Sequence, residues 1–259
     1  MKQPSLIAVD IGNTTTSVGI FADVADSFPL PNPVIQFDNA ETEFASLREY
    51  ITSDQPKLFI GSVCQVGLER FLKFVEDTDI SDSRLLANHE LPIEISVEFP
   101  DKVGIDRLLA SLAAYSLNQQ NIPSIVIDAG SAITIDVTSA GNEFLGGVIF
   151  PGLRMQTGAL YQQTDQLPLI DANFTADPPS IIGRNTESAI KSGVFWGAIG
   201  SIREIVQRLQ SEVGESKIFL TGGDLETIAH LVPDAEYVPN LVLSGIAITA
   251  RRILSNANG

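Results

Sequence analysis

The sequence contains very little cysteine and histidine. Cys64 is the single cysteine among 259 residues, which excludes an intramolecular disulfide and any zinc site built from several cysteines. The two histidines, His89 and His230, stand far apart and in no metal-ligand spacing, which argues against a zinc centre or a catalytic histidine. This cysteine usage fits a reducing cytoplasm, and we expect Cys64 to be a small buried hydrophobic side chain.

Basic residues are also scarce. The chain carries 16 Lys and Arg residues against 32 Asp and Glu, a formal charge of -16, which argues against binding to nucleic acid or to an anionic membrane. No apolar run reaches the roughly 18 residues of a membrane span, and no signal-peptide core precedes Asp10. With 44% hydrophobic residues, we expect a soluble globular protein that must hold any phosphate ligand by local contacts.

Two common nucleotide-binding signatures are missing. No G-x-x-x-x-G-K-[ST] segment occurs, and no G-x-G-x-x-G follows an expected strand. These absences exclude the P-loop and the Rossmann dinucleotide fold.

What the sequence does contain is an alternation of strands and helices typical of an α/β fold. A polar segment, SLNQQN before Pro123, marks a candidate lobe boundary. We expect strands at 5–9, 14–21, 57–63, 124–128, 132–138, 143–151 and 217–221, and helices at 41–53, from near Asp106 to 117, 186–209 and 240–254.

The opening stretch LIAVDIGNTTTSVGIF has an echo in the second half, SIVIDAGSAITIDVTS. A gapless alignment, 128 − 10 = 118 residues apart, matches Asp10 with Asp128, Gly12 with Gly130, Asn13 with Ser131 and Thr16 with Thr134. Two similar hairpins, one in each half, suggest a duplicated lobe with a cleft between the copies.

This pattern suits a phosphate chain. Glycine lets backbone N–H groups approach phosphate oxygens, and hydroxyl and amide side chains add donors. Because a carboxylate repels phosphate, Asp10 and Asp128 would have to act through a bound cation. Either hairpin alone is more often an ordinary turn, so the repetition is what favours a binding role.

Several further motifs have two interpretations each. Asp106 in Gly104-Ile105-Asp106-Arg107 is either a helix N-cap or a base for phosphoryl transfer, with Arg107 supplying positive charge. Thr186 in Gly183-Arg184-Asn185-Thr186 is a candidate cap of the next helix. The helical spacing of Gly193, Gly197 and Gly200 favours close packing against another backbone over approach to a ligand. Sharp turns are expected at Gly146-Gly147 and Pro151-Gly152, and Gly222-Gly223 at a strand end is either a common Gly-Gly turn or the border of an adenosine site.

Six segments together resemble one family, the type III pantothenate kinases of the acetate kinase, sugar kinase, Hsp70 and actin superfamily. They span nearly the whole chain in the family's order. They are DIGNTTTSVGIF at 10–21, GIDR at 104–107, DAGSAITID at 128–136, GGVIFPG at 146–152, GRNTESAIKSGVFWG at 183–197 and LTGGD at 220–224.

The resemblance implies two similar ribonuclease H-like (actin-like) lobes with a central cleft, expected at 1–118 and 119–259, with the last helix able to pack back on the first lobe. It implies ATP-dependent phosphorylation of the primary hydroxyl of pantothenate to 4'-phosphopantothenate, the first step of coenzyme A biosynthesis. It also implies Mg2+, an activating monovalent cation (K+ or NH4+) and a homodimer whose substrate pocket is completed at the subunit interface.

Site roles carried over by the resemblance fall into three groups. Asp106 would be the proton acceptor and Asp128 would bind the monovalent cation. ATP would contact Asp10, Ile11, Gly12, Asn13, Thr14, Thr15, Thr16, Ser17 and Ser131, the last at a position where the family usually has Thr. Pantothenate would contact Gly104, Ile105, Asp106, Arg107 and Thr186.

One departure and two alternatives accompany this interpretation. Many family members carry a Tyr three residues before the proline that precedes the GIDR-type motif, and here that position is Val97, before Pro100. The chain could instead be a kinase of the same fold for another small alcohol or carboxylate, such as a sugar or acetate. It could also be a nucleotide-binding regulator that has lost the transfer step.

Overall fold

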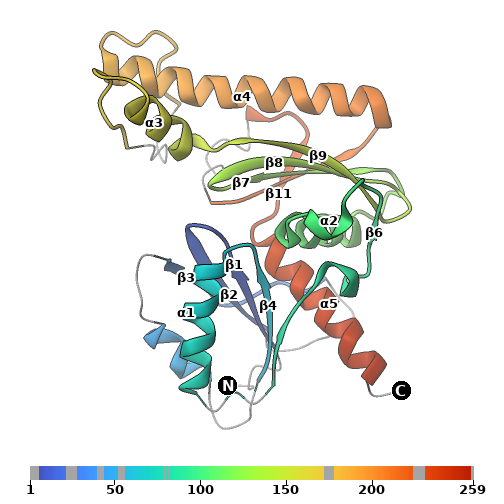
Figure 1. Cartoon of the computed structure of the whole chain (residues 1–259). Helices are drawn as coiled ribbons and strands as arrows, with labels where there is room; N and C mark the ends of the chain where they lie inside the picture. The colour runs from blue at the N-terminus through green and yellow to red at the C-terminus, as the bar shows by residue number, and fades with distance from the viewer. Residues whose placement is uncertain are drawn as a thin grey trace. The chain divides into compact units, whose positions relative to one another are not determined.

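The computed structural model describes residues 6–21, 28–39, 44–51, 56–78, 80, 82–171, 178–223 and 231–257 (Figure 1). The chain divides into two compact units, one formed by Met1–Leu117 with Asn240–Gly259 and one by Asn118–Pro239. These units differ from the expected ranges 1–118 and 119–259 mainly in the last helix, which groups with the first unit. His230 and Asp224, both considered above, lie outside the described residues.

The first unit contains a five-stranded sheet in the order β3-β2-β1-β4-β5. The hairpin expected at the start of the chain is present, with β1 and β2 antiparallel, and β4 runs parallel to β1. The strands are β1 (Leu6–Ile11), β2 (Thr15–Phe21), β3 (Val34–Asp38), β4 (Lys57–Ser62) and β5 (Ser83–Leu85).

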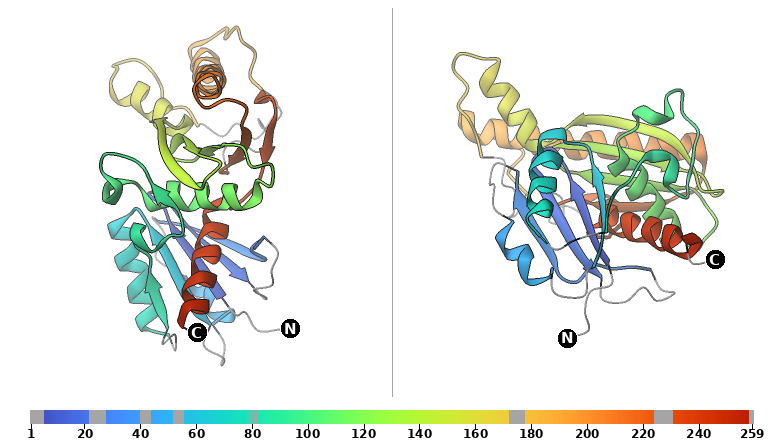
Figure 2. Two further views of the ribbon diagram at one scale, coloured as in Figure 1. Left: turned by 90° about the vertical axis from the view of Figure 1, so that its right-hand side faces the viewer. Right: turned by 60° about the horizontal axis from the view of Figure 1, so that its bottom comes forward.

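Helices cover both faces of this sheet (Figures 1 and 2). One face packs against α1 (Gln65–Glu76), whose Phe71 shares a core cluster with Val9 of β1. The other face packs against α2 (Ile105–Leu117) and α5 (Leu241–Ala257), which also pack against each other. Because both faces are covered, β1 is apolar at nearly every position up to Asp10.

Two local predictions for this unit need correction. The helical spacing expected at 41–53 gives only a short 3-10 helix, η1 (Ala45–Glu49), among the residues described there. Helix α1 was missed, although Leu68, Phe71 and Val75 lie at helical spacing and are buried. The remaining elements of this unit are η2 (Asn88–Glu90), β6 (Glu94–Ile95) and η3 (Pro100–Lys102).

The second unit orders its strands β11-β10-β7-β8-β9. As in the first unit, an antiparallel hairpin, here β7 and β8, is followed by a third antiparallel strand, and a parallel strand flanks the hairpin's first strand. The elements are β7 (Ser124–Ala129), β8 (Ala132–Thr138), β9 (Glu143–Pro151), α3 (Leu153–Gln162), α4 (Thr186–Val213), β10 (Lys217–Thr221) and β11 (Ala235–Tyr237).

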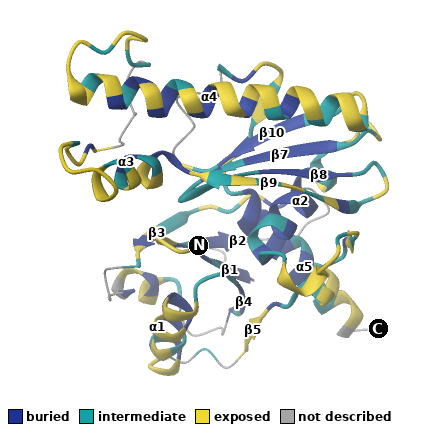
Figure 3. Ribbon diagram, turned by 45° about the horizontal axis from the view of Figure 1, so that its top comes forward, coloured by how far each residue is buried: buried dark blue, intermediate teal, exposed yellow. Residues whose placement is uncertain are grey.

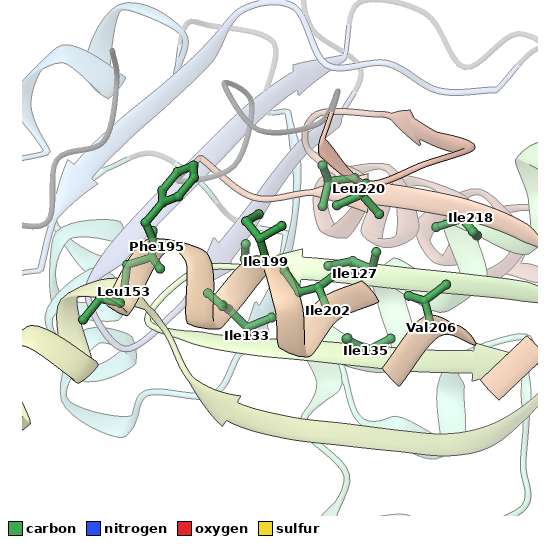
Figure 4. Packing of buried hydrophobic residues seen from close by; sticks show 14 of the residues in the cluster. Ile127, Ile133, Ile135, Leu153, Phe195, Ile199, Ile202, Val206, Ile218 and Leu220 are labelled. Carbon is green, nitrogen blue, oxygen red and sulfur yellow. The ribbon is translucent and has the colours of Figure 1, made fainter. Parts of the chain in front are cut away.

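Helix α4 buries one side against this sheet (Figures 3 and 4). Figure 4 shows Phe195, Ile199 and Ile202 of the helix pointing toward Ile127 and its neighbours on the strands. These side chains are at most 1% exposed. The alternation along β7 therefore places Ile127 on the α4 side and Asp128 on the opposite side.

Three further details of the second unit differ from expectation. Gly146 and Gly147 do not form a turn but lie inside β9, where a Cβ added at Gly147 would lie 2.2 Å from the carbonyl oxygen of Ile135. Helix α3 and strand β11 were not predicted.

In the described parts of the chain, no helix is long and apolar enough to cross a membrane.

Candidate active site

The β1–β2 turn, residues 12–15, is the first candidate for binding phosphate. Its residues Asn13, Thr14 and Thr15 are exposed, while Ile11 and Thr16 on either side are fully buried. The turn is closed by a hydrogen bond of 2.9 Å from the Gly12 N–H to the Thr15 carbonyl oxygen.

The strand pairing decides which side chains share a face with Asp10. Ser17 lies opposite Asp10 on β2, and Gly61 lies beside it on β4. Ile11 and Thr16 belong to the other face, which packs against α1. Of the nine residues expected to contact ATP, Ile11 and Thr16 therefore have buried side chains that point away from the Asp10 side.

Asp106 comes to the same side of this sheet as Asp10. An added Cβ at Gly61 would lie 2.9 Å from Leu109 Cδ1, so α2 crosses directly over the position next to Asp10. Asp106 precedes Leu109 by three residues, which puts both on one face of α2, with Asp106 at the helix start. The packing of α2 on β4 thus brings the first turn of α2 to the edge where β1 and β4 end.

Contacts at the end of β4 support this arrangement. The Val63 N–H donates to the Ile11 carbonyl oxygen at 3.0 Å, which joins the strand ends. An added Cβ at Gly104 would lie 3.6 Å from Val63 Cγ1. The carboxyl ends of parallel strands are where open α/β sheets bind ligands.

Asp106 is not the N-cap of α2, because the helix begins one residue earlier, at Ile105. Its Oδ1 accepts a hydrogen bond of 2.8 Å from the Arg107 N–H, one of the N–H groups that a helix start leaves without an intrahelical partner. Burial raises the pKa of the Asp106 carboxyl, and the hydrogen bond and charge of Arg107 oppose that rise only in part.

Cys64 is not the buried hydrophobic side chain that we expected. It is half-buried and is the N-cap of α1, where Sγ accepts from the Gly67 N–H at 3.4 Å. This capping role was missed because the helix that begins at Gln65 was not predicted.

The β7–β8 turn of the second unit is built from close backbone contacts. Added Cβ atoms would lie 2.3 Å from the Gly130 carbonyl oxygen at Gly152, and 2.3 Å from the Ala129 carbonyl oxygen at Gly222. Gly222 also has a φ of 98°, a conformation that other residues rarely adopt. These glycines let two neighbouring segments approach the turn after Asp128.

The two hairpins are similar but not identical. Both first strands have the same burial pattern, with a half-buried Asp at the fifth position. However, Asp10 lies opposite Ser17, whereas Asp128 lies opposite Thr134. The second turn is one residue shorter, so the gapless match of Thr16 with Thr134 is wrong, and Thr134 corresponds to Ser17.

Asp128 offers a chemically suitable position for a hard cation. Thr134 on β8 and Thr221 on β10 lie beside it on the neighbouring strands, on the face away from α4. Carboxylate, hydroxyl and carbonyl oxygens suit Mg2+ and K+ rather than soft metals. In the described parts of the chain no group of three or more His, Cys, Asp and Glu side chains could hold a metal by itself. A cation here would therefore need additional oxygen ligands from the nucleotide or water.

Thr186 lies on a separate apolar groove of 1220 Å³ between α3 and α4. It is exposed and is not the cap of α4, because Asn185 is the N-cap and accepts from the Ser188 N–H at 2.8 Å. Gly193 lines the same groove. No described atom lies within 4 Å of an added Cβ at Gly193, Gly197 or Gly200, so the close packing expected at these glycines is wrong for the chain alone.

The chain is similar to known proteins over most of its length. The family model described as type III pantothenate kinase matches residues 6–208. The type III pantothenate kinase of Sulfurihydrogenibium sp. is 32% identical over 229 residues, which cover 84% of this chain and 88% of the relative. The chain belongs to the type III pantothenate kinase family.

Solved structures support the fold of this type III pantothenate kinase. A Baf family transcriptional activator from Campylobacter jejuni matches with a TM-score of 0.59 at 21% identity, covering 96% of this chain and all of that chain. MreB5 of Spiroplasma citri bound to ADP matches with a TM-score of 0.53 at 10% identity, covering 99% of each chain. The kinase therefore has the actin-like ATPase fold that the family resemblance implied.

Sequence reasoning missed several residues that shape the kinase's candidate site. Asn39, which contacts the β1–β2 turn, carries no motif signal because it is separated from the turn by more than 20 residues. Thr221 is recognisable only through the parallel pairing of β7 with β10. Asn185 could have been predicted as the cap of α4, since Asn is among the best N-cap residues.

Proposed function

We propose that this kinase transfers the γ-phosphoryl group of Mg-ATP to the primary hydroxyl of pantothenate, giving 4'-phosphopantothenate, in the cytoplasm. The family membership supports the substrates, and one structural relationship supports the site. Asp106 and Asp10 share one side of the first sheet at its carboxyl edge, with Gly61 and Leu109 between the two elements. A phosphate-binding turn and a half-buried carboxylate at one edge suit phosphoryl transfer to an alcohol.

The phosphates would be bound by the β1–β2 turn. Backbone N–H groups of Gly12 to Thr15 and the hydroxyls of Thr14, Thr15 and Ser17 would supply donors, with Asn13 at the exposed tip. Ile11 and Thr16 would act from behind, because their side chains are buried. In the second unit, the hydroxyl of Ser131 would contact ATP.

Asp106 would orient the hydroxyl of pantothenate and accept its proton. A raised pKa makes a carboxylate a better proton acceptor, provided that it is ionised at the working pH. Gly104 would allow the substrate to approach, Arg107 would supply positive charge, and Ile105, which is buried, would contribute through its backbone. Thr186 would contact pantothenate through its exposed hydroxyl.

Two kinds of cation would be held mainly by oxygen ligands. Asp128 would bind the monovalent cation, K+ or NH4+, and Asp10 would act on the phosphates through Mg2+. When bound, these cations neutralise phosphate charge. The protein's own part is to keep both carboxylates half-buried at the ends of β1 and β7.

A coupled kinase assay tests this function. The purified chain is given Mg-ATP with pantothenate, a panel of sugars or acetate, in potassium and then in sodium buffer. We expect turnover with pantothenate and faster turnover in potassium. Turnover with a sugar or acetate alone would support the other kinase, and tight ATP binding without turnover would support a regulator.

We also propose that the groove between α3 and α4 is covered by a second copy of the chain. Its apolar lining, the open space at Gly193 and the exposed Met155, Ile181 and Ile182 nearby in sequence support this proposal. Sedimentation velocity should give a dimer for the wild type. A Cβ added at Gly193 meets no described atom of the same chain within 4 Å, so Gly193→Leu should fold, whereas its side chain would obstruct a partner and give a monomer. A dimeric Gly193→Leu variant would contradict this interface.

A further inference from the structure

Asn39 holds the β1–β2 turn from behind, through both its side chain and its backbone N–H. Asn39 Nδ2 donates to the Gly12 carbonyl oxygen at 2.7 Å, and Asn39 Oδ1 accepts from the Thr16 hydroxyl at 2.7 Å. The Asn39 backbone N–H donates to the Thr14 carbonyl oxygen at 2.8 Å. Three hydrogen bonds, which together we call the brace, thus join Asn39, directly after β3, to Gly12, Thr14 and Thr16.

These bonds fix the direction of two peptide groups. A trans peptide is planar, with its C=O and N–H pointing in opposite directions. Since the carbonyls of Gly12 and Thr14 point to Asn39, the N–H groups of Asn13 and Thr15 point away from it. Asn13 and Thr15 are exposed residues, and both of these N–H groups face away from Asn39. Successive N–H groups arranged in this way form anion-binding concavities.

The described turn also lacks one of the two hydrogen bonds of a simple two-residue hairpin. In such a hairpin the Gly12 carbonyl would accept from the Thr15 N–H, but here it accepts from Asn39 instead. No backbone hydrogen bond joins the Thr15 N–H to the Gly12 carbonyl in the described turn, so this N–H is not used in closing the hairpin.

Helix α1 secures the brace in turn. Arg70 donates through Nη1 to the Asn39 carbonyl oxygen. An added Cβ at Gly67 would lie 3.4 Å from Asn39 Nδ2 and 2.8 Å from Ile11 Cγ2, so this glycine lets the first turn of α1 approach the end of β1. Asn39 thus connects the turn to the packed core of the first unit.

We propose that Asn39 is a positioning residue that orients the backbone N–H groups of Asn13 and Thr15 toward the phosphates of ATP, with Thr16 as its partner. This inference rests on the proposed phosphate-binding role of the turn. Asn39 itself would not touch the nucleotide, because it lies on the α1 side of the sheet together with Thr16.

The test compares Asn39→Ala with a matched control, Asn118→Ala. Asn118 is likewise half-buried, and its Nδ2 donates to the Ile122 carbonyl oxygen at 2.8 Å and to Ser124 Oγ at 2.9 Å, in a different part of the chain. Calorimetric titration with Mg-ATP should show affinity about tenfold weaker for Asn39→Ala and changed less than about twofold for Asn118→Ala. The KM for pantothenate should stay unchanged in both variants.

Two further variants guard against simple misfolding. Thr16→Val removes one bond at nearly constant volume and should weaken Mg-ATP by about threefold. Its effect should be non-additive with Asn39→Ala, because the two residues share a bond. Asn39→Asp replaces the donor to Gly12 with a carboxylate, so its affinity should recover in part at acidic pH, where a protonated acid can donate again. Asn39→Ala should show no such recovery.

The outcomes separate this inference from the proposed function. Wild-type affinity for Mg-ATP in Asn39→Ala, or equal losses in Asn39→Ala and Asn118→Ala, would overturn the positioning role even if pantothenate is phosphorylated. Phosphorylation of a different acceptor by the wild type would overturn the proposed substrate and leave the binding comparison valid. Reduced amide-exchange protection at residues 12–15 in Asn39→Ala alone would support the brace.

Discussion

Gly104 lies so close to Asp106 that a Cβ added to it would be 2.5 Å from Asp106 Oδ1. The absence of a side chain at Gly104 therefore sets where the carboxylate can lie. The same oxygen accepts from the Arg107 N–H at 2.8 Å, which holds the carboxylate at the start of α2. The glycine of the GIDR segment thus supports the proposed base directly.

Gly104→Ala should displace the Asp106 carboxylate and lower kcat by about tenfold to a hundredfold, because small displacements of a catalytic group are costly. Affinity for Mg-ATP should change little. Gly158→Ala in α3 is the control, since no described atom lies within 4 Å of its added Cβ. Steady-state kinetics on both variants check this prediction. Unchanged kcat in Gly104→Ala would show that the carboxylate has room to adjust.

The pH dependence should reflect the raised pKa of Asp106. The carboxyl must be ionised to accept a proton, so kcat/KM for pantothenate should fall as the pH drops through the folded pKa, above the ordinary value of 3.8. The hydrogen bond and charge of Arg107 should limit how far this pKa lies above the ordinary value. A pKa from the acid side of the pH–rate profile at or below the ordinary value would contradict the assignment of Asp106 as the base.

The same shift predicts a stability effect of opposite sign to the activity effect. Because the pKa is higher in the folded than in the unfolded chain, the folded state binds more protons in this window, and the free energy of unfolding falls as the pH rises through it. Asp106→Asn should lack this part of the slope. Urea unfolding of both proteins across the window measures the difference.

Gly222→Ala should destabilise the second unit by about 1–3 kcal/mol, because a positive φ is costly for alanine. Its Cβ would also lie 2.3 Å from the Ala129 carbonyl oxygen, next to Asp128, so the response to potassium should weaken. The neighbouring Gly223→Ala is the matched control, since no described atom lies within 4 Å of its added Cβ. Thermal unfolding and the potassium dependence of turnover should distinguish the two variants. Equal behaviour would contradict the close-contact account.

The sequence predicted the hairpins well because their signals are local. The apolar runs that end at Asp10 and Asp128, and the β-branched strands after them, depend on residues close together in the chain. The one-residue difference between the turns was hidden, because register depends on pairing rather than on composition. Only the strand partners reveal that Ser17, not Thr16, corresponds to Thr134.

Contacts between distant segments could not be predicted in the same way. Asn39 reads as an ordinary loop residue, yet it holds Gly12 through a contact that spans 27 positions. The approach of Leu109 to Gly61, which brings Asp106 to the side of Asp10, follows from packing of α2 on the sheet. Two helix starts also differ by one residue from the prediction. Helix α2 begins at Ile105 and not at Asp106, and the N-cap of α4 is Asn185 and not Thr186.

The most direct test of the account is the rate of phosphoryl transfer in Asp106→Asn. Rapid-quench single turnovers with enzyme-bound Mg-ATP and saturating pantothenate would measure 4'-phosphopantothenate formation separately from substrate binding. The account predicts that the variant folds, binds both substrates within about threefold of the wild type, and forms product about 10²–10⁴ times more slowly. Product formation at the wild-type rate would contradict the assignment of Asp106 as the base.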